Sequence, residues 1–318
     1  MASTPGPEDL KVRTLADRYW DEFLPLRPLF ATQVGEERFD HLLPDPSPDG
    51  LGRRESVDRE VLKKMGLIDR RALSEEGRTA LDVVETLAHD ELSAIRYRFD
   101  RFDAADQMWG PGTVLAQLGS IQQADTPQRL ERYVVRLRAL PAFLAAWADV
   151  LRDAADSGQT SPRLVVDRTI TQVERLLRSD PAESSALSPV PESDGEGRTR
   201  VHDTIRDLVY PAYQDYLRAL RDHRSMARET LALSALPGGD EMYRAKIEAW
   251  TTLSMEAGEI HERGVQELAR IQQERRDVAA RVGAPDSETT IARLTEKGDN
   301  AFASREELLR LAEEQVRR

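Results

Sequence analysis

The stretch Thr126–Asp156, TPQRLERYVVRLRALPAFLAAWADVLRDAAD, carries the clearest sign of the fold. Apolar residues recur in it at three- and four-residue spacing, at Leu130, Val134, Leu137 and Leu144. This spacing places them on one face of an α-helix. Thr126 precedes Pro127, a pair typical of a helix start because the hydroxyl caps the first turn and proline fits the first helical position. The stretch therefore predicts one long amphipathic helix.

The same periodicity runs through most of the chain and predicts an all-α fold, a multi-helix array without strands. Helices are expected near 8–24, 54–65, 74–103, 112–123, 126–156, 162–178, 199–232, 239–253, 257–282, 286–296 and 304–317. Pro141 and Pro211 are expected to kink or divide their helices, because proline lacks the amide hydrogen and crowds the preceding turn.

Residues 179–198 interrupt this pattern with a composition rich in Ser, Pro and Glu. Such a composition is typical of a mobile linker or a long surface loop. The sequence therefore predicts an N-terminal helical region over 1–178 and a second helical region over 199–318 that packs on the first.

Charge and composition exclude several classes of function. The formal net charge of −12 opposes binding to a phosphate backbone, so no nucleic-acid partner is expected. No stretch is long and apolar enough to span a membrane, and the first residues do not resemble an export signal. The absence of cysteine fits a cytoplasmic location and removes thiolate chemistry.

The histidines do not form a recognisable metal motif. The chain holds five of them, at His41, His89, His202, His223 and His261. None are four residues apart, the spacing at which two histidines on one helix face bind zinc. Glu85 and His89 have helical i,i+4 spacing and are interpreted as a surface pair. No metal-binding residue is therefore predicted.

Other candidate motifs also have ordinary structural interpretations. Ser120 lacks the glycine pattern of a nucleophile elbow, and Gly110-Pro111-Gly112 lacks the remaining glycines of a phosphate loop. Arg96, Arg98 and Arg101 form a basic cluster that suits a carboxylate, although Asp100 and Asp103 beside them favour an ion-pair network. The four tryptophans are expected in the core. They are Trp20, Trp109, Trp147 and Trp250.

Three phrases of the sequence carry a resemblance to a known family. The first is Leu29–Asp40 followed by Leu43–Asp45, and the second runs over Leu137–Val166. The third is Leu233–Gly239, LSALPGG, followed by residues within Glu259–Ile271. In order and spacing, these phrases resemble the helical bacterial family known as domain of unknown function 885 along nearly the whole chain. LPGG also predicts a helix stop and turn by itself.

The resemblance implies a fold like the N-terminal half of helical gluzincin-like zinc peptidases. Complete members carry a His-Glu motif, a later Gly-His-His and a downstream acid, and nothing in this chain matches them. Glu256-Ala257 also replaces the family's usual Thr-Pro. The resemblance thus implies zinc and a peptide-like substrate only for complete proteins, so the catalytic residues of this chain stay unknown and no cofactor is predicted in it.

Three functional hypotheses follow. The chain ends in Glu313–Arg318 without a glycine stop, which favours a truncated or split family member, inactive until a C-terminal zinc-bearing half or another protein partner completes it. The alternative is a free-standing helical binding or interaction protein. The third hypothesis is a metal-free hydrolase that uses two carboxylates, or one of them with His89.

Overall fold

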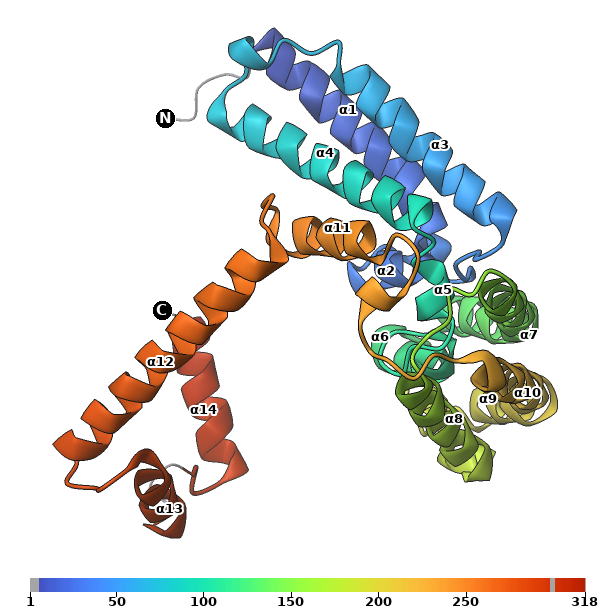
Figure 1. Cartoon of the computed structure of the whole chain (residues 1–318). Helices are drawn as coiled ribbons and strands as arrows, with labels where there is room; N and C mark the ends of the chain where they lie inside the picture. The colour runs from blue at the N-terminus through green and yellow to red at the C-terminus, as the bar shows by residue number, and fades with distance from the viewer. Residues whose placement is uncertain (1–5, 298–300, 318) are drawn as a thin grey trace. The chain divides into compact units, whose positions relative to one another are not determined.

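The structure, a computed structural model, describes residues 6–297 and 301–317 (Figure 1). These residues are helical and contain no strand, apart from one isolated bridge between Pro162 and Arg228. The predicted all-α fold is confirmed. Contacts between residues divide the chain into two compact units, Met1–Thr252 and Leu253–Arg318.

Three long helices form the first part of the N-terminal unit and lie side by side in Figure 1. They are α1 (Pro7–Phe23), α3 (Pro48–Met65) and α4 (Glu75–Arg96). The hydroxyls of Ser47 and Ser74 cap α3 and α4 by accepting hydrogen bonds from backbone amides of the first turn. The short α2 (Pro28–Gln33) was not predicted, because six residues are too few to show a helical period.

A second group of helices surrounds the larger core of the same unit. It consists of α6 (Val114–Ile121), α7 (Pro127–Asp156), α8 (Arg163–Arg178), α9 (Gly195–Thr204) and α10 (Tyr210–Met226). The stretch Thr126–Asp156 forms α7, and its predicted bounds are confirmed to within one residue. Its apolar face is buried, with Leu137 and Leu140 fully enclosed.

Proline and backbone strain affect three places in these helices. Helix α7 continues through Pro141, because buried side chains on both sides hold the helix together. Pro211 follows a π-helical turn, Ile205–Val209, which links α9 to α10 without a break. By contrast, the predicted helix 74–103 is divided into α4 and α5 (Asp100–Asp103), since Arg98 adopts a left-handed φ of 52°.

Residues 179–198, predicted as a linker or long surface loop, are packed against the larger core. Two 3-10 turns form within them, and Ala186, Leu187 and Val190 are buried. The Tyr133 hydroxyl of α7 donates a hydrogen bond to the Ala186 carbonyl at 2.7 Å. The division between compact units therefore falls after Thr252 and not at this segment.

The C-terminal unit has little interior of its own. It consists of α12 (Ala257–Arg281), α13 (Ser287–Lys297) and α14 (Arg305–Val316). Among its described residues, Ala279 and Ala284 alone are buried. Large apolar side chains, including Leu268 and Ile271 of α12, are exposed.

Candidate binding groove

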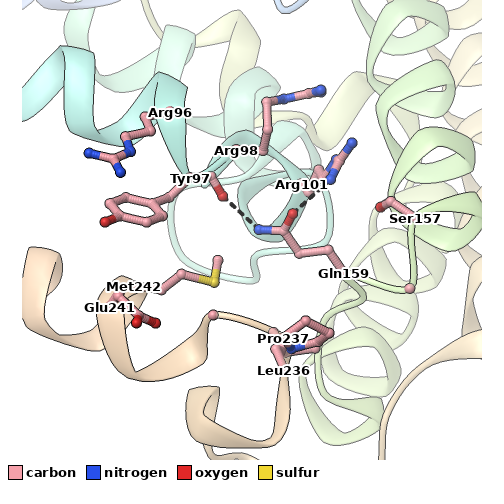
Figure 2. A pocket seen from close by; sticks show the side chains of 12 residues that line it. Arg96, Tyr97, Arg98, Arg101, Ser157, Gln159, Leu236, Pro237, Glu241 and Met242 are labelled. Carbon is pink, nitrogen blue, oxygen red and sulfur yellow. Dashed lines mark hydrogen bonds between the residues drawn. The ribbon is translucent and has the colours of Figure 1, made fainter.

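A cavity of about 520 Å³ lies in the N-terminal unit, where the end of α4 faces the start of α11 (Gly239–Thr251) (Figure 2). The residues that form its inner surface come from three separate parts of the chain, 96–101, 157–159 and 236–242. They include Tyr97, Arg101, Gln159, Leu236, Pro237 and Met242. The cavity thus depends on tertiary packing, because no single element supplies its walls.

One wall is the corner that follows α4, and two arginines fix its backbone. The Arg98 guanidinium donates to Asp100 and Asp153 at 2.9 and 2.8 Å. Arg101 donates to Asp153 at 2.9 Å and to the Gln159 side-chain oxygen at 2.7 Å. The Gln159 amide in turn donates to the Tyr97 carbonyl at 2.6 Å. These bonds hold the left-handed Arg98 in place, so the corner is rigid.

These bonds also affect ionisation at the corner. Hydrogen bonding from Arg101, with the charge of Arg98 nearby, holds the pKa of the Asp153 carboxyl below its usual range. Asp153 is therefore an anion at neutral pH. Carboxylates of the protein itself balance the positive charges of Arg98 and Arg101.

The opposite wall is the turn Leu236-Pro237-Gly238-Gly239, the most specific phrase of the family resemblance. Gly238 has a φ of 70°, which glycine adopts without strain. A Cβ on Gly239 would lie 1.9 Å from the Leu233 carbonyl oxygen, so this position has room only for hydrogen. The turn leads directly into α11, as predicted. Leu236 and Met242, 9% and 3% exposed, form an apolar floor.

A second hollow of about 670 Å³ adjoins the first, between α3, α4 and α11. The two hollows share Arg96, Tyr97 and Glu241. We call the combined surface the α4–α11 groove. Its second part is lined by further polar and charged side chains, among them Glu55, Arg59, His89 and Glu248.

Arg96 is the arginine of the predicted basic cluster that faces the groove without an internal carboxylate partner. Among the described residues, no Asp or Glu lies within ion-pair distance of it, whereas Arg98 and Arg101 are paired as the ion-pair interpretation predicted. Their shared partner is Asp153, however, and not Asp103. The Arg96 guanidinium lies 5.2 Å from the centroid of the Tyr97 ring.

The other candidate residues do not assemble a catalytic arrangement. Glu85 forms an ion pair with Arg70 rather than with His89, and His89 is an exposed residue of the second hollow. The Ser120 hydroxyl donates to the Gln117 carbonyl of its own helix. Gly110 directly precedes a 3-10 turn, Pro111–Thr113, that leads into α6. His261 lies exposed near the start of α12.

The tryptophans follow the predicted core positions only in part. Trp147 is partly buried against the larger core, and Trp20 is 40% exposed. Trp109 and Trp250 are 77% and 84% exposed, so their predicted burial is wrong. Helical spacing alone cannot distinguish a buried helix face from an exposed one.

The residues that the structure describes do not fit a zinc site. Within the described ranges, no group of three or more His, Asp or Glu side chains converges on one point that could hold a metal ion. Zinc needs at least three such protein ligands in a catalytic site. The groove, with its apolar floor and charged edges, is therefore suited to binding a ligand. No step of metal chemistry is assigned to it. No described helix is long and apolar enough to cross a membrane.

Comparisons with known proteins agree on the fold. A "putative lipoprotein" from Colwellia psychrerythraea superimposes with a TM-score of 0.75 at 16% identity, over 88% of this chain and 52% of that one. A "putative lipoprotein of unknown function" from Shewanella oneidensis gives 0.59 at 16% identity, over 88% and 48%. The chain thus spans about half the length of these solved structures. No curated protein matches.

A family model described as "Bacterial protein of unknown function (DUF885)" matches residues 28–318. This range covers most of the first compact unit and all of the second, and it includes both walls of the α4–α11 groove. The chain therefore belongs to the DUF885 family of bacterial proteins.

Proposed function

We propose that this chain is the ligand-binding helical half of a two-part hydrolase of the zinc-peptidase type, and that a second helical half supplies the reactive centre. The observation that carries this proposal is the apolar surface of the C-terminal unit. On α12 and its end, Val265, Leu268, Ile271, Val278 and Val282 are each 44–58% exposed. We call these five residues the α12 stripe.

The α12 stripe needs a covering surface for energetic reasons. Ordering one residue's backbone costs about 1–2 kcal/mol, and burial of apolar area offsets this cost at about 25 cal/mol per Å². Among its described residues, only Ala279 and Ala284 are buried, so the C-terminal unit gains little stabilisation from apolar burial within itself. A helical partner that buries the stripe would supply it. The greater length of the matched solved structures supports a partner of this kind.

The size of the groove in the N-terminal unit is consistent with a small, peptide-like substrate in this proposal. Its two hollows, about 520 and 670 Å³, lie in the size range of small-molecule sites. Zinc, in this proposal, belongs to the second half, because the described residues of this chain offer no ligand cluster. The chain then contributes to catalysis by binding and positioning the substrate.

The test is to purify the native species from its host with an antibody against the N-terminal unit, and to measure its zinc content and peptide hydrolysis with and without a chelator. The proposal predicts about one zinc per copy of this sequence and hydrolysis that the chelator abolishes. A native species without zinc and without hydrolysis would refute it.

A free-standing binding protein is the second candidate function. The specific observation in its favour is that both walls of the α4–α11 groove belong to one compact unit. Under this alternative, the native species binds peptides but contains neither zinc nor hydrolytic activity. The same purification therefore separates the two functions.

A further inference from the structure

We infer that the α4–α11 groove binds a short peptide through a carboxylate, and that Arg96 is the residue that binds this carboxylate. That the bound peptide is a substrate rests on the proposed function. That the groove binds a peptide does not. Binding itself follows from three features of the groove.

The first feature is the position of Arg96. It is the last residue of α4, it is exposed, and it lines both hollows of the groove. Figure 2 shows its guanidinium above the Tyr97 ring on one side of the cavity, with Glu241 and Met242 on the other. Stacking on an aromatic ring orients a guanidinium and leaves its N–H edge available.

The second feature is charge complementarity. Three nearby arginines already pair with carboxylates of the protein: Arg98 with Asp100 and Asp153, Arg101 with Asp153, and Arg59 with Glu55 at 2.6 Å. Among the described residues, Arg96 has no such carboxylate partner. A guanidinium of this kind favours a carboxylate ligand, because the two planar groups can form paired hydrogen bonds.

The third feature is the apolar floor beside this charge. Leu236 and Met242 are nearly buried and line the first hollow next to Tyr97. They provide a surface for an apolar side chain next to the bound carboxylate. Glu241, on the opposite wall, offers an acceptor for peptide N–H groups. Together these groups match a peptide better than a small inorganic anion, which would use only the arginine.

The test measures binding of three peptides to the full chain by isothermal titration calorimetry. The probes are N-acetyl-Ala-Leu-Phe with a free terminal carboxylate, its C-terminal amide, and N-acetyl-Ala-Glu-Phe amide, which has only a side-chain carboxylate. One charge-assisted contact is worth about 1.4 kcal/mol or more, so a carboxylate peptide should bind about tenfold more tightly than the neutral amide. The better of the two acids identifies the source of the carboxylate.

The variants assign this preference to Arg96. Arg96→Gln should bind both acids as weakly as the amide, and Arg96→Lys should keep part of the preference because it retains the charge. Arg18→Gln is the matched control, since it removes an exposed arginine on α1 that pairs with Glu22. It should bind like the wild type. Circular dichroism verifies that each variant is folded.

Two results would overturn the inference. Either the wild-type chain fails to prefer an acid over the amide, or Arg96→Gln retains the preference while folded. These results are independent of hydrolysis, because no reaction is measured. If the chain binds the acid peptides but its native species has neither zinc nor hydrolytic activity, the binding site is supported and the proposed function is refuted.

Discussion

Arg136 of α7 shows how a single buried residue joins distant parts of the chain. Its guanidinium is fully buried and donates to Thr32 and Gln122 side chains at 2.9 and 2.8 Å and to the Phe39 carbonyl at 2.7 Å. The Asp40 carboxylate lies 3.9 Å away. Burial lowers the pKa of Arg136 to about 10, so it is still a cation at neutral pH. It connects the segment after α2 to α6 and α7.

Replacing Arg136 with Met should therefore be costly. The change leaves Asp40 buried without its cation and the Phe39 carbonyl without its donor, a loss of about 3–5 kcal/mol in the free energy of unfolding. Arg132→Met, one turn away, is the control because the Arg132 side chain is 40% exposed and its pair with Glu37 at 3.4 Å is worth at most about 1 kcal/mol. Urea unfolding measures both, and equal losses would contradict the assigned role.

Asp58 gives stability a pH dependence. Its carboxyl is fully buried, accepts a hydrogen bond from the Tyr19 hydroxyl at 2.7 Å and lies 3.6 Å from Arg27. Burial raises the pKa of Asp58 to about 6, against the opposing effects of Tyr19 and Arg27. Since this pKa is above the unfolded value of about 3.9, the folded state holds the proton more tightly. The resulting stability is present below about pH 4 and is lost as pH rises through about 6.

Asp58→Asn should remove this dependence, because the amide stays neutral at every pH. Between pH 4 and pH 7, the free energy of unfolding of the wild type should fall by about 2 kcal/mol relative to the variant. Urea unfolding at several pH values measures the difference. Asp149→Asn, at a side chain that is 70% exposed, is the control and should follow the wild type. Parallel profiles for the wild type and Asp58→Asn would refute the assignment.

At the scale of elements, the sequence predicts long helices well and their interruptions poorly. Helix α7 has a capping Thr126, a first-position proline and a continuous apolar face, and all three signals act locally. The break after α4 has no such signal, because Arg98 is held at a φ of 52° by Asp153, a residue far away in sequence. Likewise, residues 179–198 have a loop-like composition, yet α7 supplies the partner that packs them.

In the turn before α11, we expect one added methyl group at Gly239 to be destabilising. Gly239→Ala would place its Cβ 1.9 Å from the Leu233 carbonyl oxygen, so the turn must shift, at a cost of about 1–3 kcal/mol. Gly258→Ala in α12 meets no atom within 4 Å and should be neutral or stabilising by up to about 1 kcal/mol. Thermal unfolding and peptide titration compare them. A Gly239→Ala variant with wild-type stability and affinity would exclude this turn as a rigid wall.

At the scale of the whole molecule, the two units differ in how completely they bury their apolar residues. The N-terminal unit has two cores, whereas the described part of the C-terminal unit buries only Ala279 and Ala284. The sequence identified the arginine cluster and the LPGG turn separately. Their position on opposite walls of one groove was not predictable, because more than a hundred residues separate Arg96 from Leu236 and local periodicity carries no information on such pairing.

The α12 stripe predicts strong binding of a dye for exposed apolar surface. Replacing Leu268 and Ile271, 56% and 44% exposed, by Gln should reduce dye fluorescence while changing stability by no more than about 0.5 kcal/mol. Glu267→Gln with Arg270→Gln, a surface pair on the same helix, is the control and should leave dye binding unchanged. Weak dye binding by the wild-type chain would contradict an uncovered stripe.

In the function proposed above, this chain acts as one half of a two-part assembly. Native mass spectrometry of the species in its host measures this most directly, with the antibody against the N-terminal unit used for isolation. We expect a mass far above 35.9 kDa, because in the proposed assembly this sequence is joined or bound to a second helical half of comparable length. A native species of 35.9 kDa that carries no partner would contradict the claim.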